Sequence, residues 1–160
     1  MSFTGILCAD DDAHGRRLMR EALTASGLAN ELRFVKDGVE LLEYLQHRGR
    51  YVVPADAPRP GVILLDLNMP RMDGREAARL IKSDPALRSI PIIVLTTSKS
   101  ELDVSQSYEV GANSYIAKPV TFDGLVEVMR TLGRYWFEIG ELPSLTGPVR
   151  APRDWFPASP

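Results

Sequence analysis

Short apolar runs alternate with amphipathic stretches along most of this chain of 160 residues. The apolar runs are TGILCA, ELRFV, GVILLDL, PIIVLTT and SYIAK. Each is followed by apolar residues at helical spacing, which predicts helices over residues 13–26, 38–47, 74–83, 101–110 and 122–137. Near-continuous Val, Ile and Leu runs are typical of parallel strands buried on both faces. The pattern therefore predicts an α/β fold, a doubly wound five-stranded parallel sheet with helices on both faces.

Polar residues stand where the predicted strands end. Asp10 and Asp11 follow the first apolar run, Asp66 ends the third, Thr96 ends the fourth and Lys118 follows the fifth. In an open parallel sheet, ligands bind outside the carboxyl ends of the strands, where the strand order reverses. With strand order 2-1-3-4-5, the strands that carry these residues are neighbours. We therefore expect the five side chains to converge at one edge of the sheet.

Three consecutive carboxylates, Asp10, Asp11 and Asp12, follow the first strand. Unit charges about 4 Å apart repel by about 1 kcal/mol in water and about 4 kcal/mol at an effective dielectric constant of about 20, so the cluster opposes folding unless something offsets it. Asp12 precedes a predicted helix and suits its N-cap. By itself, the stretch is compatible with either a solvated loop that caps a helix or a cation site.

Composition and charge narrow the class of protein. Hydrophobic residues make up 44% of the chain and the formal net charge is −2, which is typical of a globular domain and offers no basic surface to nucleic acid. No apolar run approaches the roughly 20 residues of a membrane span, and the N-terminus lacks the features of a signal peptide. We expect a cytoplasmic protein that binds neither nucleic acid nor membrane. The single cysteine, Cys8, lies in an apolar strand, which favours a buried structural side chain.

Two segments depart from the alternation. Residues 47–61, HRGRYVVPADAPRPG, form a long connection whose prolines and glycines predict a surface loop. Residues 138–160 are rich in proline and are too few to build a second core. We therefore expect a globular domain over residues 1–137 and a C-terminal arm over residues 138–160.

Four motifs in this order resemble a response regulator receiver domain: DD after the first strand, LLDLNMPRMDG around the third, LTTS after the fourth and SYIAKP at the fifth. The resemblance covers residues 4 to about 137. Through GANSYIAKPV and LGRYWFEIGELP it extends to the single-domain regulators that accompany bacterial and cyanobacterial phytochromes. This resemblance implies a flavodoxin-like receiver fold, which agrees with the predicted sheet.

The resemblance implies that the chain is a phosphoacceptor. Asp66 corresponds to the residue that takes a phosphoryl group from a histidine kinase in a Mg2+-dependent reaction, and a phytochrome-type kinase, a bacteriophytochrome, is the implied donor. A carboxylate can act as a nucleophile towards phosphorus, and Mg2+ prefers oxygen ligands. The implied metal ligands are Asp10, Asp11, Asp66 and the backbone carbonyl of Asn68.

The resemblance also assigns the residues around the phosphoacceptor. Lys118 supplies a positive charge for the phosphoryl oxygens, and the hydroxyl of Thr96 contacts one of them. Tyr115 corresponds to a switch aromatic that turns inward when the threonine moves, although simple packing in the strand is the alternative. The family has a cis peptide bond before the proline that corresponds to Pro119. We expect Gly74, in RMDG, to relieve backbone strain where the loop enters the third helix.

Two other classes of function share parts of this pattern. A small phosphohydrolase of the haloacid dehalogenase group also uses an aspartyl nucleophile, but it carries a second acid two residues later, where this chain has Asn68. A degenerate receiver that only binds other proteins would lack some of the site residues, and here all are present. The sequence therefore favours a switch protein over an enzyme that turns over an external substrate.

The end of the chain predicts self-association. In the last predicted helix, Leu125, Val128, Met129 and Leu132 share the face towards the sheet. The apolar residues Val126, Trp136, Phe137 and Ile139 remain uncovered, and monomers rarely leave such a patch exposed. The tail either folds back over its own domain or reaches across a homodimer, and the resemblance favours the dimer. The residues expected at that contact are Tyr135, Trp136, Phe137, Ile139 and Leu142.

Overall fold

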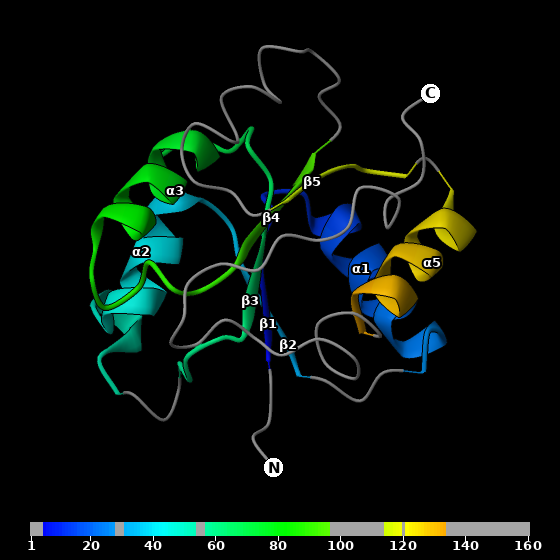
Figure 1. Cartoon of the computed structure of the whole chain (residues 1–160), viewed down its shortest axis with the longest axis horizontal. Helices are drawn as coiled ribbons and strands as arrows, with labels where there is room; N and C mark the ends of the chain where they lie inside the picture. Colours follow the sequence, from blue (N-terminus) through cyan, green and yellow to red (C-terminus); the bar gives the residue numbers. More distant parts are fainter. Residues whose placement is uncertain (1–4, 28–30, 54–56, 97–113, 120, 134–160) are drawn as a thin grey trace.

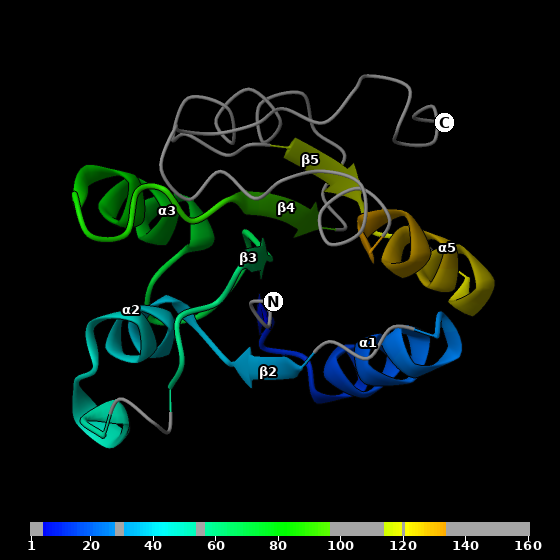
Figure 2. The ribbon, with the colours of Figure 1, turned by 60° about the horizontal axis from the view of Figure 1, so that its bottom comes forward.

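The sheet has five parallel strands in the order β2-β1-β3-β4-β5. The computed structural model describes residues 5–27, 31–53, 57–96, 114–119 and 121–133. Figure 2 shows β2, β3, β4 and β5 following one another across the sheet. The predicted sheet and its strand order are confirmed. The strands are β1 (Ile6–Ala9), β2 (Leu32–Val35), β3 (Val62–Leu65), β4 (Ile92–Thr96) and β5 (Ser114–Ala117).

Helices cover both faces of this sheet. In Figure 1, α2 and α3 lie on one side of it, and α1 and α5 lie on the other. Within the described residues, no helix is both long enough and apolar enough to cross a bilayer. The helix predicted over residues 101–110 lies outside the described residues. The described helices are α1 (Ala13–Ala25), α2 (Gly38–Gln46), the short 3-10 helix η1 (Gly49–Tyr51), α3 (Gly74–Ser83) and α5 (Phe122–Leu132).

Polar N-caps determine where these helices begin. The side chains of Asp12, Asp37, Asp73 and Thr121 each accept a hydrogen bond from a backbone N–H in the first turn of α1, α2, α3 and α5, respectively. Such a bond satisfies one of the donors that a helix start leaves without an intrahelical partner. The prediction of Asp12 as an N-cap is confirmed.

Alternate strand residues pack against opposite helix layers. Leu7 and Ile63 belong to the core on the α2 and α3 side, whereas Ile6, Cys8 and Leu64 belong to the core on the α1 and α5 side. Both faces of the sheet are therefore buried, which explains why the strands are continuously apolar. Cys8 is buried as predicted, and burial raises the pKa of its thiol.

The buried face of α5 is wider than the sequence predicted. Leu125, Val128, Met129 and Leu132 are buried, as expected. The prediction that Val126 stays uncovered is wrong, because this side chain is only 9% exposed and belongs to the same core cluster. Since α1 lies beside α5 (Figure 1), α5 packs against a helix as well as against the sheet.

The connection over residues 47–61 is partly packed, so the prediction of a surface loop is wrong for that part. It contains η1, and Ala57 is only 1% exposed. The hydroxyl of Tyr44 donates to the carbonyl of Pro58 at 2.9 Å, which fastens the connection to α2. The exposed residues of the connection, among them Val52 and Val53 after η1, match a solvated loop.

Candidate functional site

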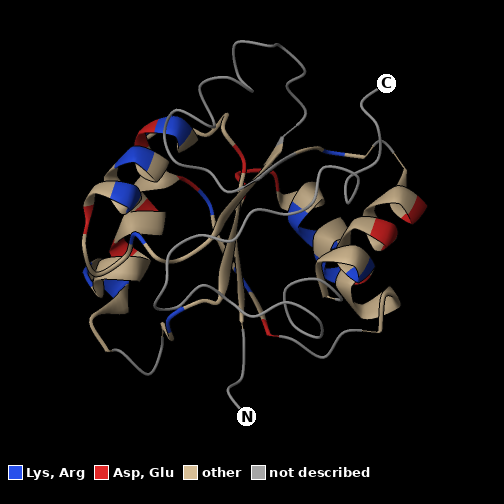
Figure 3. Ribbon diagram, in the orientation of Figure 1, with Lys and Arg blue, Asp and Glu red and all other residues tan. Residues whose placement is uncertain are grey.

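Three carboxylates meet at the carboxyl ends of β1 and β3. These strands are paired with Ala9 beside Leu65, so the residues that follow each strand are neighbours. One oxygen atom from each of Asp10, Asp11 and Asp66 lies within 4.8 Å of the others. Figure 3 shows acidic segments meeting at this upper edge of the sheet. The expected convergence is confirmed for these three residues.

Lys118 joins the carboxylates from the end of β5. Its Nζ donates to Oδ2 of Asp10 at 2.7 Å and lies 4.0 Å from Oδ2 of Asp66. Burial by itself lowers the pKa of Lys118, but the hydrogen bond to Asp10 and the charges of Asp10 and Asp66 outweigh it and raise that pKa. The side chain is therefore a fixed ammonium at neutral pH, and it offsets part of the repulsion among the acids.

Each of the three consecutive acids has a different environment. Asp10 is 2% exposed, and its Oδ1 accepts a hydrogen bond from the backbone N–H of Asp12 at 2.9 Å. Asp12 caps α1, whereas Asp11 is exposed. Arg16 adds a hydrogen bond from Nη1 to the backbone carbonyl of Asp10 at 2.8 Å. Of the two alternatives for this stretch, Asp12 fits the capped loop, and Asp11 with Asp66 fits the cation site.

The peptide bond before Pro119 differs from the expectation. Within the described residues no peptide bond is cis, so the cis bond that the resemblance implied is wrong for this structure. Lys118 follows β5 directly, and its side chain reaches Asp10 from a trans backbone.

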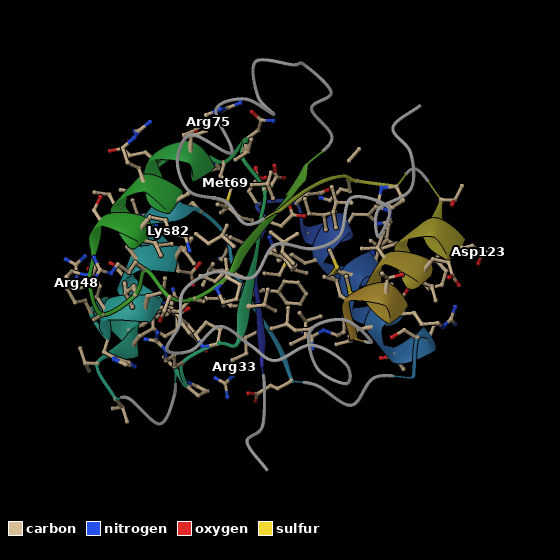
Figure 4. All side chains as sticks on the ribbon, viewed as in Figure 1. Arg33, Arg48, Met69, Arg75, Lys82 and Asp123 are labelled. Carbon is tan, nitrogen blue, oxygen red and sulfur yellow. The ribbon has the colours of Figure 1, made fainter. Side chains whose placement is uncertain are left out.

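Asp66 begins a loop that folds tightly against its own backbone. The N–H of Asp66 donates to the carbonyl of Ala9 at 3.0 Å, and the N–H of Asn68 donates to Oδ1 of Asp66 at 3.1 Å. Gly74 closes the loop with a hydrogen bond from its N–H to the carbonyl of Leu67 at 2.9 Å. Figure 4 labels Met69 and Arg75, which belong to this loop and to the start of α3, at the same edge of the sheet.

The reason predicted for Gly74 is wrong. Its φ is not positive, so the position does not demand left-handed backbone. Instead, a Cβ atom here would clash with the carbonyl oxygen of Asp66 and would lie 2.8 Å from Cα of Leu67. Close approach of two backbone segments, rather than strain, therefore requires glycine at this position.

The sequence analysis missed an ion pair between this loop and the start of α2. Arg71 donates from Nε to Oδ2 of Asp37 at 2.8 Å and from Nη2 to Oδ1 at 3.1 Å. Burial by itself raises the pKa of Asp37, but the hydrogen bonds from Arg71 and from the α2 backbone outweigh it and lower that pKa. The only signal in the sequence is the N-cap position of Asp37 before a helix, which gives no hint of its partner.

Thr96 and Tyr115 lie on adjacent strands, with Thr96 paired to Ala117 and Tyr115 paired to Val94. Their side chains lie outside the described part of the structure. Their backbone positions are those expected, but whether their side chains reach the carboxylates stays a prediction. The residues expected at a dimer contact also lie outside it: Tyr135, Trp136, Phe137, Ile139 and Leu142.

The donor set of the cluster fits a hard divalent cation. All the side-chain groups on offer are carboxylates, and such cations take oxygen ligands. The Asp66 side chain keeps 15% of its surface exposed, so an incoming group can reach it. A carboxylate beside a fixed ammonium can attack an anionic electrophile, because the positive charge offsets repulsion during the approach.

Comparison with known proteins agrees with this geometry. The profile of the response regulator receiver domain matches residues 6–130. The chain is 40% identical over 139 residues to response regulator Rcp1 of Synechocystis, in an alignment that covers 87% of this chain and 92% of Rcp1. Nothing in the comparisons supports the phosphohydrolase alternative.

Solved structures show the same fold over most of the chain. Response regulator RPA3017, described in red light signaling of R. palustris, is 36% identical with a TM-score of 0.83, covering 89% of this chain and all (100%) of that one. The phosphorylated cyanobacterial phytochrome response regulator RcpA is 40% identical with a TM-score of 0.81, covering 89% and 100%. The Mn2+-bound form of Rcp1 is 39% identical with a TM-score of 0.78, covering 88% and 99%. Matches of this extent, to proteins with the same sheet, make the chain a member of the response regulator receiver family.

Proposed function

We propose that this protein is a single-domain response regulator. It accepts a phosphoryl group on Asp66 from a phytochrome-type histidine kinase and signals through protein contacts, as a switch rather than as an enzyme with an external substrate. The observation that carries the proposal is the grouping of Asp66 with two further carboxylates and Lys118 at the end of the sheet. The similarity to RcpA, a phytochrome response regulator, supports the kinase class.

The proposed chemistry follows from the positions of Asp66 and Lys118. An oxygen of Asp66 attacks the phosphorus of a phosphohistidine, an acyl phosphate forms, and the phosphorus–nitrogen bond breaks. Phosphoryl transfer depends mainly on positioning and charge neutralisation. The ammonium of Lys118, 4.0 Å from Asp66, is available to contact the transferred oxygens.

Mg2+ is the proposed cofactor. Asp11 and Asp66 would be its direct side-chain ligands, Asp10 would act mainly through water, and the backbone carbonyl of Asn68 would complete the share of the protein. When bound, the ion neutralises the negative charge of the carboxylates and the phosphoryl oxygens. The Mn2+-bound structure of Rcp1 supports a divalent cation in this family.

Thr96 and Tyr115 are the proposed switch residues. The hydroxyl of Thr96 would donate to a phosphoryl oxygen, and Tyr115 would turn inward as the threonine moves. Their strands pair directly in the sheet, which supports coupled movement. The proposed location is the cytoplasm, with no nucleic acid or membrane partner, in line with a net charge of −2.

The proposal is tested by incubating the pure protein with a phytochrome-type histidine kinase and ATP. Label that appears on Asp66 supports it. If no label appears with either the kinase or acetyl phosphate, a receiver that only binds other proteins becomes the better explanation.

Asp11→Asn is expected to weaken Mg2+ binding and, through it, phosphorylation. The variant loses a charged direct ligand, and even residues behind metal ligands change affinity by about 10- to 100-fold, so we expect a loss of about tenfold or more. The unliganded protein should be slightly more stable, because repulsion within the cluster is reduced. Calorimetric Mg2+ titration checks the affinity. Equal affinity in the variant and the wild type would show that Asp11 is not a ligand.

A homodimer is the proposed assembly, with the receiver domain over residues 1–137 and an arm over residues 138–160. Each arm would cross to the partner domain near β5 and α5. The prolines support this, because a stiff extended segment loses less entropy when it docks. The dimer would then form without phosphorylation.

Removing residues 138–160 is expected to give a monomer or a weaker dimer. The truncation takes away apolar contacts that the arm makes with the partner, so the dissociation constant rises. Light scattering at several protein concentrations measures the change, with the full-length unphosphorylated chain as the control. A full-length chain that sediments as a monomer at micromolar concentration would refute the proposal that the arm holds a homodimer together.

A further inference from the structure

The backbone of Arg71 has an unusual conformation. Among the described residues other than glycine, only His47 and Arg71 have positive φ, at 55° and 64°. His47 ends α2, where left-handed residues are common. Arg71 lies instead in the loop between Asp66 and α3, and no helix end explains its conformation.

The turn around Arg71 is of a strained type. The N–H of Met72 donates to the carbonyl of Pro70 at 2.7 Å, which closes a three-residue turn with Arg71 at its centre. A γ-turn with positive φ at the central residue is the rarer and more strained of the two forms. Strained backbone persists only when the surrounding structure holds it, and it is concentrated at functional sites.

Two contacts with the start of α2 hold this turn. Arg71 makes its bidentate ion pair with Asp37, whose side chain is 10% exposed. The N–H of Gly38 donates to the carbonyl of Met72 at 3.2 Å. A Cβ atom at Gly38 would lie 2.5 Å from that carbonyl oxygen, so the two backbones are in direct contact.

The turn around Arg71 belongs to the same short loop as Asp66, the candidate phosphoacceptor. Asn68, whose carbonyl is a proposed metal ligand, lies three residues before Arg71 in the sequence. Before the turn, the N–H of Asn68 donates a hydrogen bond to Oδ1 of Asp66, and after it the N–H of Gly74 donates to the carbonyl of Leu67. The loop is thus held by hydrogen bonds on both sides of Arg71, and only two residues separate Arg71 from Asn68.

We propose that Arg71 and Asp37 form a positioning pair for the phosphorylation site. By holding the strained turn against α2, the pair sets the direction of the Asn68 carbonyl and of the Asp66 carboxylate. In this proposal the pair orients those two groups and does not itself bind the metal or the phosphoryl group. This inference rests on the proposed function of Asp66 and adds two residues that act behind it.

Arg71→Gly and Asp37→Ser test the pair without unfolding the loop. Glycine adopts positive φ without strain, so Arg71→Gly still permits the turn while it removes the side chain that holds the turn against α2. Serine retains an N-cap for α2, so Asp37→Ser removes only the acceptor for Arg71. Arg79→Ala, on the exposed face of α3, is the control for loss of one positive charge.

The measurements are Mg2+ affinity by calorimetric titration and the rate of phosphorylation by acetyl phosphate at saturating Mg2+. We expect each single variant to bind Mg2+ about tenfold more weakly and to react more slowly, as for other residues that orient metal ligands. The double variant should lose no more than either single one, because both act through one interaction. Arg79→Ala should match the wild type.

A purely structural role predicts a different result. Variants that lose unfolding free energy but keep wild-type Mg2+ affinity and reaction rate would overturn the proposal. Additive losses in the double variant would also overturn it, because the two residues would then act separately. A wild-type chain that takes no phosphoryl group would refute the proposed function instead, and the Mg2+ affinities would still decide whether Arg71 and Asp37 position the loop.

Discussion

Asp66→Asn is expected to abolish phosphorylation, both by a histidine kinase and by acetyl phosphate. The amide nitrogen and oxygen of asparagine are poor nucleophiles towards phosphorus, so no acyl phosphate forms. The fold should remain intact, because asparagine has nearly the same shape and its Oδ1 can still accept the hydrogen bond from the N–H of Asn68. Lys118 keeps its partner in this variant, since its 2.7 Å hydrogen bond is to Asp10.

The measurement is the stoichiometry of acid-labile label at saturating phosphodonor and Mg2+, with circular dichroism as the check on folding. Asp12→Asn is the matched control, because it makes the same acid-to-amide change in the adjacent acidic stretch. Asparagine is as good an N-cap as aspartate, so this control should keep both the fold and the label. Stoichiometric label on folded Asp66→Asn would reject Asp66 as the acceptor.

The elements that the sequence predicted well depend on local rules. Buried parallel strands need apolar side chains on both faces, so runs such as GVILLDL identified β3 without further information. Helix starts need an N-cap, so Asp12 marked the start of α1. Strand order then brought Asp10 and Lys118 together, although 108 residues separate them in the chain.

What the sequence analysis missed or predicted wrongly concerns contacts with no local signal. The pair between Asp37 and Arg71 joins residues 34 positions apart, and neither residue type indicates a partner. Val126 is buried because α1 lies against α5, and an amphipathic pattern reports only the face that the helix presents to a single neighbour. The role of Gly74 depends on how closely α3 approaches the end of β3, and a sequence carries no such distance.

Because of that close approach, Gly74→Ala is expected to destabilise the protein. The new Cβ would clash with the carbonyl oxygen of Asp66 and lie 2.8 Å from Cα of Leu67, and neither backbone atom can turn aside as a flexible side chain can. Either α3 or the end of β3 must shift, and overpacking of this kind costs about 1–3 kcal/mol of unfolding free energy. The hydrogen bond from Gly74 to Leu67, at 2.9 Å, would be stretched by the same movement.

Gly15→Ala is the matched control for this change. Gly15 also lies in the first turn of a helix beside the carboxylates, but its Cβ would meet only side-chain atoms, 3.1 Å from Oδ2 of Asp10 and 3.4 Å from Oδ2 of Asp12. Alanine favours a helix over glycine by about 1 kcal/mol, and only side-chain oxygens have to give way, so this variant should lose much less stability than Gly74→Ala. Urea unfolding of both variants at one pH measures the difference.

Gly74→Ala is expected to slow phosphorylation as well as to lower stability. Movement at Gly74 displaces the backbone of Asp66 itself, so folded Gly74→Ala should be phosphorylated by acetyl phosphate about tenfold more slowly or worse, as when a reacting group is misplaced by a fraction of an ångström. A chain with alanine at position 74 that is as stable as the wild type would show that α3 can move away at little cost. The nucleophile would then be held by contacts other than the packing of α3 against the end of β3.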